Sequence, residues 1–385
     1  MLRQVEGSQA VAEAVARCRP QVVCAYPISP QTHIVEALSR LVRGGALLGC
    51  EYVNVESEFA ALSVAIGASA TGARAYTATA SQGLLFMAEA LYNAAGLGLP
   101  IVMTVANRAI GAPINIWNDH SDAMSQRDSG WLQLYAADNQ EAADLHVQAF
   151  RIAEELSVPV MVCMDGFVLT HAVERLDVPE QSTVDSFLPP YRPRQVLDPE
   201  HPVTIGALVG PEAFTEVKYL AYRAQQAALE LIPAVAADFR DRFGRDSGGL
   251  LHGYDLAGAD TVVIALGSVL GTLRDAVAEL RAEGAARVGV LGLTAFRPFP
   301  AAAIRAAVAG AGRVVVLDRA LAVGGTGGVV GTEVRAALGG AVPVHEVIAG
   351  LGGRPVRARS LRQLLTDGNL PPFSFLDLDH AAIEH

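Results

Sequence analysis

The chain has 385 residues, enough for two domains of ordinary size. Hydrophobic residues make up 51% of it and charged residues 18%, a composition typical of a well-filled globular core and not of a disordered chain. The formal net charge is -11, and the sequence contains no clustered basic stretch. Because nucleic-acid phosphates require a basic footprint, we expect no nucleic-acid partner.

The sequence also predicts the cellular compartment in which the protein is found. Its first residues, MLRQVEGSQAV, lack the apolar stretch of a signal peptide, and no uninterrupted apolar run reaches about 18 residues. We therefore predict a cytoplasmic protein with no membrane span. No C-x-x-C motif for zinc or an iron–sulfur cluster is present. The apolar neighbours of the cysteines predict reduced, buried thiols at Cys18, Cys24, Cys50 and Cys163.

Residues 1–175 alternate short apolar runs with helical patterns. We predict buried parallel strands at 22–25, 52–55, 75–79, 101–105 and 159–164. Helices are predicted between them at 32–41, 57–68, 82–94 and 141–155. Ser57 and Ser81 stand where helix N-caps are expected. The alternation predicts a doubly wound α/β sheet with ligand-binding crevices at the carboxyl ends of its strands.

The composition changes after this region. Residues 176–250 begin with a proline-rich polar stretch and continue as a helical pattern over 212–243, which predicts a linker and helical connection. Residues 251–365 resume the alternation, with strands at 261–265, 288–291 and 314–318, and predict a second, smaller α/β domain. Residues 366–385 are predicted to be a C-terminal tail.

Two motifs near the N-terminus carry candidate functional groups. YPISPQT, at residues 26–32, follows the first predicted strand and presents the hydroxyl of Ser29 between two prolines. The alternative is a rigid turn without a ligand. Glu58 begins an almost wholly apolar helix, in which a carboxyl group could hold or share a proton. The alternative is an ordinary carboxylate at a helix N-terminus.

Two further motifs follow strands. TATASQG, at residues 77–83, is a small-residue turn in which Thr79 and Ser81 add hydroxyl groups. Arg108 follows the apolar strand IVMTV and is well placed to bind a carboxylate bidentately, although a surface ion pair would also explain it. The polar loop at 115–131 contains Asp119, His120 and Asp122, but these lie too close in sequence to predict a metal site, and we predict none in this chain.

Taken together and in order, these motifs resemble the α subunit of the pyruvate and related 2-oxoacid:ferredoxin oxidoreductases. The resemblance is carried by YPISPQT, the ESEFAA helix, TATASQGL, NRAIGAPINIWNDHSDAMSQRDSGW and MDGFVLTH, and then by LGSVLGTLRDAV, FRPFP, VVVLDRA and GLGGR. It covers nearly the whole chain and is weakest in the proline-rich linker and the last 20 or so residues. It implies a pyrimidine-side thiamine diphosphate-binding domain followed by a transketolase C-terminal-like domain.

The resemblance also implies roles for individual residues. Ser29 occupies the hydroxyl position of the family's YPITP turn, beside substrate and cofactor. Glu58 matches the glutamate that hydrogen-bonds the aminopyrimidine ring of thiamine diphosphate. Arg108 matches the arginine that binds the 2-oxoacid carboxylate. Thr79, Ser81 and Gln82 are implied to line the same cleft.

The sequence lacks a motif that thiamine enzymes usually have, and the resemblance explains where it lies instead. The chain contains no G-D-G followed about 25 to 30 residues later by asparagine, the usual thiamine-enzyme signature for magnesium and diphosphate. The resemblance implies that a β subunit carries this site and a [4Fe-4S] cluster, and that γ and ferredoxin-like δ subunits complete the complex. The implied reaction is oxidative decarboxylation of a 2-oxoacid, pyruvate favoured, with coenzyme A and ferredoxin.

Two alternatives remain open at this stage. The chain could belong to a non-oxidative thiamine diphosphate enzyme, which would need no ferredoxin and no cluster-bearing partner. It could also be a non-catalytic scaffold subunit that has kept the fold, although Ser29, Glu58 and Arg108 are all chemically competent.

Overall fold

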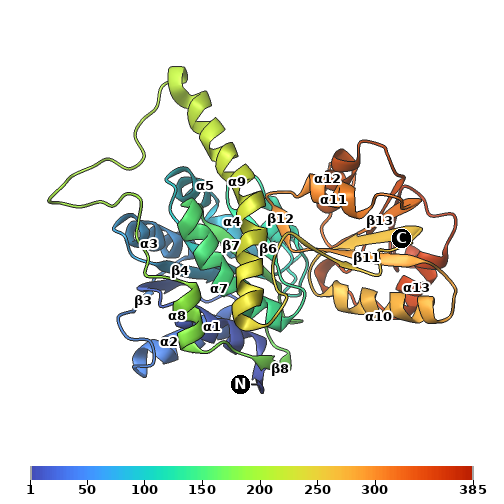
Figure 1. Cartoon of the computed structure of the whole chain (residues 1–385), viewed down its shortest axis with the longest axis horizontal. Coiled ribbons are helices and arrows are strands. Elements are labelled where there is room, and N and C mark those ends of the chain that lie inside the picture. The colour runs from blue at the N-terminus through green and yellow to red at the C-terminus, as the bar shows by residue number, and fades with distance from the viewer. Residues whose placement is uncertain (1, 384–385) are drawn as a thin grey trace.

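The computed structural model describes residues 2–383, which form two α/β sheets and a long helix beside the first (Figure 1). The strands of the first sheet are β2 (Val22–Ala25), β3 (Glu51–Asn54), β4 (Ala75–Thr79), β5 (Val102–Asn107), β6 (Leu132–Tyr135), β7 (Val160–Asp165) and β12 (Ala295–Arg297). Their order is β12-β6-β7-β5-β4-β2-β3. All neighbours pair in parallel except β12, which runs antiparallel to β6. The doubly wound sheet expected from the sequence is confirmed.

Helices cover both faces of this sheet. One face packs against α1 (Gly7–Arg17), α2 (Thr32–Arg43) and α7 (Asn139–Leu156). The other face packs against α3 (Glu58–Ala70), α4 (Ser81–Phe86), α5 (Ala88–Gly96) and α6 (Ser121–Ser125). Every residue of β4, β5 and β7 is buried, as expected for central parallel strands between two helical layers.

The connecting region contains more regular structure than its composition predicts. β8 (Val173–Asp177) pairs antiparallel with β1 (Leu2–Glu6), and α8 (Gln181–Phe187) follows. Residues 188–210 then run without helix or strand to α9 (Pro211–Phe243).

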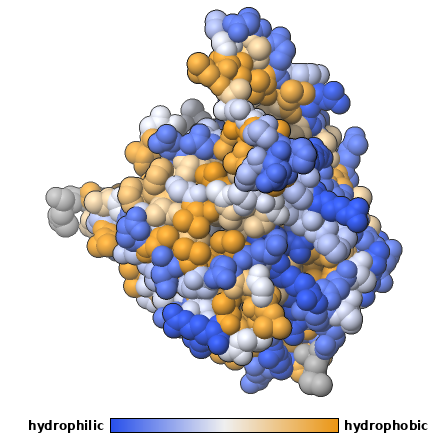
Figure 2. Space-filling view, turned by 90° about the vertical axis from the view of Figure 1, so that its left-hand side faces the viewer, coloured by the Kyte–Doolittle hydropathy of each residue, from blue (hydrophilic) through white to orange (hydrophobic). Residues whose placement is uncertain are grey.

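Helix α9 is buried along only part of its length. Its second half packs onto the core through Ala228, Ile232, Val235 and Phe239, spaced as one face of a helix. Its first turns project from the body of the molecule (Figure 1) and expose Phe214, Tyr219 and Leu220. Apolar side chains are visible on this projection at the top of Figure 2. They leave an apolar surface unpartnered within residues 2–383.

The second sheet has the order β15-β14-β13-β10-β11-β9, with only β9 antiparallel to its neighbour. Its strands are β9 (Leu251–Tyr254), β10 (Thr261–Ala265), β11 (Val288–Leu293), β13 (Arg313–Asp318), β14 (Val344–Ile348) and β15 (Phe373–Phe375). The helices of this region are α10 (Val269–Ala282), α11 (Ala301–Ala307), α12 (Val329–Leu338), α13 (Ala358–Thr366) and the short 3-10 turns η1 (Leu351–Gly353) and η2 (His380–Ala382). β15 therefore belongs to the sheet, although it lies within the residues expected to form a tail.

The four cysteines are free and buried, as predicted. Among the described helices, none combines the length and apolar character that a membrane crossing requires.

Candidate active site

The predicted site residues gather where the first sheet changes its winding direction. β2 and β4 are neighbours, and the chain leaves them toward opposite edges of the sheet, to β3 on one side and β5 on the other. Ser29 follows β2, Thr79 ends β4, and Arg108 follows β5. Such a switch point at the carboxyl ends of parallel strands is where open α/β sheets bind ligands.

Glu58 lies in the first turn of α3. The helix begins after Ser57, whose hydroxyl accepts the backbone N–H of Ala60 at 3.1 Å, so the predicted N-cap is confirmed. The Glu58 side chain is buried, with 8% of the residue exposed. Because Ser57 makes the cap, the Glu58 carboxylate is not needed for capping.

Glu58 and Thr79 meet over Gly83. A methyl group added at Gly83 would lie 2.7 Å from Oε1 of Glu58 and 2.6 Å from Oγ1 of Thr79. The Thr79 hydroxyl is buried and has no hydrogen-bond partner within the described residues. Most buried hydroxyl groups have a hydrogen-bond partner, so the unpaired Thr79 hydroxyl is an exception that needs an explanation.

Ser81 was expected to cap a helix, and this prediction is wrong. α4 is preceded by Ala80, and Ser81 is its first residue, with a positive φ of 49°. Its hydroxyl donates to the carbonyl oxygen of Ala109 at 2.5 Å and also contacts the side-chain oxygen of Gln82. The Ser81 hydroxyl is therefore already paired within the chain, whereas the Thr79 hydroxyl is not.

Arg108 is tied to the loop that contains Ser29. Its Nη1 donates to the carbonyl oxygen of Ser29 at 2.9 Å, and its Nε donates to the carbonyl oxygen of Asn115 at 3.2 Å. Burial lowers the pKa of the guanidinium from its usual value, and the nearby Asp122 opposes that effect. The Ser29 residue itself is exposed. Arg108 and Ser29 thus lie together at the carboxyl ends of β5 and β2.

Asp122 connects these groups, a role that the sequence did not reveal. Its carboxylate accepts backbone N–H groups from Ser81 at 3.0 Å, Arg108 at 2.9 Å and Ala123 at 2.7 Å, and the side-chain amide of Asn107 at 2.8 Å. Complete burial raises the pKa of Asp122 to about 6, although these hydrogen bonds oppose the rise. Its only sequence signal was its place in an unusually polar loop.

Asp119 and His120, which lie in the same loop as Asp122, have different hydrogen-bond partners. Asp119 accepts the backbone N–H of Gly352 at 3.1 Å, and Nε2 of His120 lies 2.6 Å from Oδ1 of Asp165. These partners differ from those of Asp122, which binds Ser81 and Arg108. The loop therefore joins the site to the second sheet.

A buried ionic cluster completes this junction. Asp165, at the end of β7, accepts hydrogen bonds from Nη1 of Arg319 at 2.8 Å and from the backbone N–H of Ser268 at 2.9 Å. Burial alone would raise the pKa of Asp165, but Arg319 and His120 outweigh it and hold the pKa below its usual range. The carboxyl end of β7 in the first sheet is thereby joined to the carboxyl ends of β10 and β13 in the second.

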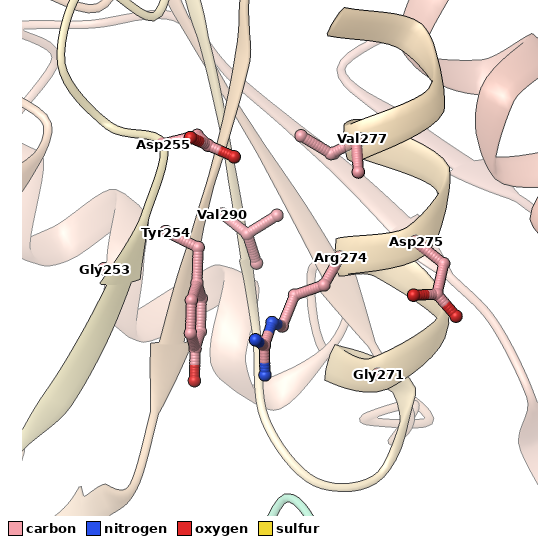
Figure 3. Close-up of a pocket in the computed structure, with 9 residues that line it drawn as sticks. Gly253, Tyr254, Asp255, Gly271, Arg274, Asp275, Val277 and Val290 are labelled. Atoms are coloured by element: carbon pink, nitrogen blue, oxygen red, sulfur yellow. The ribbon is translucent and has the colours of Figure 1, made fainter. Parts of the chain in front are cut away.

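A separate cavity of about 660 Å³ lies between β9 and α10 (Figure 3). The guanidinium of Arg274 lies over the ring of Tyr254 there, at 4.2 Å from the ring centroid. None of the predicted site residues lines this cavity. Size alone therefore does not identify the functional site of this chain.

Comparison with known proteins agrees with the motifs. The family described as pyruvate flavodoxin/ferredoxin oxidoreductase, thiamine diphosphate-binding, matches residues 13–236. The pyruvate:ferredoxin oxidoreductase core domain II matches residues 259–361.

Curated relatives span nearly the whole chain. Pyruvate synthase subunit PorA of Methanosarcina barkeri is 51% identical over 368 residues, covering 94% of this chain and 91% of its own. Ketoisovalerate oxidoreductase subunit VorA of Pyrococcus abyssi is 41% identical over 367 residues, covering 94% and 92%.

Solved structures agree on the fold. A 2-oxoglutarate:ferredoxin oxidoreductase from Magnetococcus marinus matches with a TM-score of 0.74 at 19% identity, over 94% of this chain and 64% of that one. A split-gene transketolase matches with a TM-score of 0.55 at 15% identity, over 94% and 97%. The chain therefore belongs to the pyruvate flavodoxin/ferredoxin oxidoreductase family, and it is the α subunit of a 2-oxoacid:ferredoxin oxidoreductase.

Proposed function

We propose that this chain supplies the aminopyrimidine side of a thiamine diphosphate site for oxidative decarboxylation of a 2-oxoacid. The products are an acyl-coenzyme A, carbon dioxide and reduced ferredoxin, and pyruvate is the favoured substrate. The observation that carries the proposal is the group formed by Glu58 and Thr79 over Gly83.

The residues fit an aminopyrimidine ring. The ring offers nitrogen acceptors and an exocyclic amino donor, and the chain offers a carboxyl group at Glu58 and an unpaired buried hydroxyl at Thr79. The lack of a Cβ at Gly83 lets the Glu58 carboxyl group and the Thr79 hydroxyl both lie close to its backbone. When bound, thiamine diphosphate supplies the electron sink for the loss of carbon dioxide.

Each side chain then has a distinct task. Glu58 would offer its carboxyl group to the aminopyrimidine ring and exchange a proton with it as general acid and base. Arg108 has Nη2 left over after its two carbonyl contacts, and this nitrogen binds the substrate carboxylate. Ser29, exposed beside it, offers its hydroxyl to the substrate. Asp122 positions Arg108 and Ser81 through their backbone.

We further propose that other subunits complete the site. A β subunit would carry the Mg²⁺ and diphosphate ligands and a [4Fe-4S] cluster, because this sequence has neither G-D-G…N nor cluster cysteines. γ and ferredoxin-like δ subunits would pass electrons to ferredoxin. The exposed apolar residues on the projecting turns of α9 support contact with another polypeptide.

The choice of pyruvate rests on the relatives. The 51% identical relative is named for pyruvate, and a 41% identical one for ketoisovalerate. The name of the second relative and that of the matching family also favour an oxidoreductase over the non-oxidative alternative.

Glu58→Gln in the assembled enzyme tests the proposal. The amide cannot supply the proton, so turnover should fall by about 10² to 10⁴-fold while the cofactor stays bound. Glu56→Gln is the matched control, because Glu56 is an exposed carboxylate two residues earlier. Near-normal ferredoxin reduction by Glu58→Gln would leave the scaffold role as the better account.

The half-site is tested by calorimetry. The chain alone should bind thiamine diphosphate poorly, because the diphosphate and metal ligands are assigned to its partner. Tight Mg²⁺-dependent binding by the isolated chain would contradict the shared site and leave the Glu58 assignment standing.

A further inference from the structure

Three side chains with metal-binding groups meet at the surface of the molecule. Glu6 ends β1, His33 lies in the first turn of α2, and His171 lies in the turn after β7. One ligand atom from each lies within 4.8 Å of the other two. Within residues 2–383, no other group of three such side chains lies this close. Positions 6, 33 and 171 are too far apart in the sequence to form a recognisable motif.

The surroundings leave the three groups available. Glu6 directly precedes α1, yet its side chain accepts no capping hydrogen bond. Thr170 contacts Nδ1 of His171 at 2.7 Å, which fixes the ring and leaves Nε2 for another partner. The side chains of His33 and Glu6 are 48% and 31% exposed, so an ion can reach them from solvent.

The two imidazole rings lie against each other, with their centroids 4.6 Å apart. Two ring nitrogens and one carboxylate oxygen therefore converge on one place from three segments of the chain.

We propose that Glu6, His33 and His171 form a site for a divalent transition-metal ion, with Zn²⁺ the best match. Two imidazoles and one carboxylate, with a fourth position open, are a common zinc ligand set. Zinc ligands lie about 3.4 Å apart in a tetrahedron with bonds of about 2.1 Å. His33 and Glu6 must therefore move apart from 2.6 Å, while the 4.8 Å separation closes. The exposure of both side chains permits this rotation.

The bound ion would link three separate segments. α2 follows directly after the turn that contains Ser29, and His171 lies five residues after Gly166, where β7 has just ended. The site would therefore fix the start of α2 against the turn after β7. This role is independent of the chemistry proposed for Glu58 and Arg108.

An ion pair between His33 and Glu6, with the tilted ring of His171 beside it, would explain the contacts without a metal. Titration of the full chain with Zn²⁺ and Co²⁺ separates the two accounts. We expect one equivalent to bind, with the visible absorption of four-coordinate cobalt and a higher unfolding temperature. His33→Gln and His171→Gln should each weaken binding by at least about 10-fold.

The matched control is His201→Gln. His201 also lies near a carboxylate, at 3.2 Å from Asp198, but has no third ligand, so binding should be unchanged. Carbethoxylation of the wild-type chain needs no variant: Zn²⁺ should protect His33 and His171 and leave His201 reactive. Absence of binding at micromolar Zn²⁺, equal binding by all variants, or no selective protection would each overturn the proposal.

Discussion

Nη1 of Arg108 donates to the carbonyl oxygen of Ser29 at 2.9 Å and so joins the loop after β5 to the loop after β2. Arg108→Lys leaves one nitrogen to replace three, and it cannot keep the contacts to Ser29 and Asn115 and also bind a carboxylate. We expect KM for the 2-oxoacid to rise about 10-fold or more, with little change in thiamine diphosphate affinity. Steady-state kinetics and a cofactor titration on one preparation measure both.

Arg313→Lys is the control for this change. Arg313 also donates to two carbonyl oxygens, those of Asp367 and Leu365, but it lies in the second sheet. Its substitution should leave KM unchanged. If Arg108→Lys instead abolished cofactor binding at constant KM, Arg108 would belong to the cofactor site.

Gly83→Ala tests the close approach of Glu58 and Thr79 to Gly83. The added methyl group would lie within 2.7 Å of polar atoms of both residues, so one of them must move out of the site. We expect the affinity of the assembled enzyme for thiamine diphosphate to fall about 10-fold or more. Losses of this size are typical when a residue that positions a ligand-binding group is disturbed. Gly67→Ala in the neighbouring helix α3 has free space around it and should be neutral or stabilising. Equal affinity in both variants would show that nothing binds there.

Asp122→Asn should change the pH dependence of stability. The folded chain binds the Asp122 proton up to about pH 6, whereas an unfolded aspartate loses it near pH 4. The stability that this proton contributes is therefore complete below about pH 4 and lost as the pH rises to about 6. The unfolding free energy of the wild type should fall relative to the variant by up to about 3 kcal/mol across that window.

Urea unfolding of the full chain at several pH values measures this difference. The variant should also lose turnover, because an amide group brings N–H donors against the N–H groups of Ser81 and Arg108. Asp128→Asn in the same loop removes only long ion-pair contacts, of 3.7 Å or more, and is the control. Parallel curves for wild type and Asp122→Asn would refute the assignment.

Arg319→Met should be among the most destabilising substitutions. It removes the 2.8 Å partner of Asp165 and leaves a buried carboxylate with less compensation, a loss of about 3–5 kcal/mol. Arg287→Met breaks the 2.9 Å pair with Asp260, whose side chains are 72% and 64% exposed, and should cost about 1 kcal/mol or less. Denaturant unfolding compares the two. Similar losses would mean that the junction tolerates an unpaired charge.

The parts of the fold that depend on local patterns were predictable. β4 and β10 have the bounds expected from the sequence, because each is a short, mainly apolar segment that is buried throughout. The helix expected over residues 82–94 is instead two helices, α4 and α5, which meet at Met87. β6 was missed because its four residues, LQLY, form neither an apolar run nor a strict alternation.

The parts that depend on distant partners were not predictable. Asp122 and Asp119 look equivalent in the sequence, yet one binds Ser81 and Arg108 while the other binds Gly352 in the second sheet. The unpaired state of Thr79 can be seen only when its neighbours are known. The roles carried over for Ser29, Glu58 and Arg108 stay predictions until the variants are measured.

The antiparallel strand β12 ties together two parts of the fold that are separate in the sequence. Ala295 and Arg297 pair with Leu134 and Gln133, although the strands around them in sequence build the other sheet. A protease that cut the chain at residues 244–250 would produce two fragments that stay associated. Strand β12 would still pair with β6, and the buried ring of Phe296 would still pack against Tyr135. The fragments could dissociate only if β12 lost its pairing with β6 in the first sheet. The nicked molecule should therefore migrate as one particle and melt in a single transition.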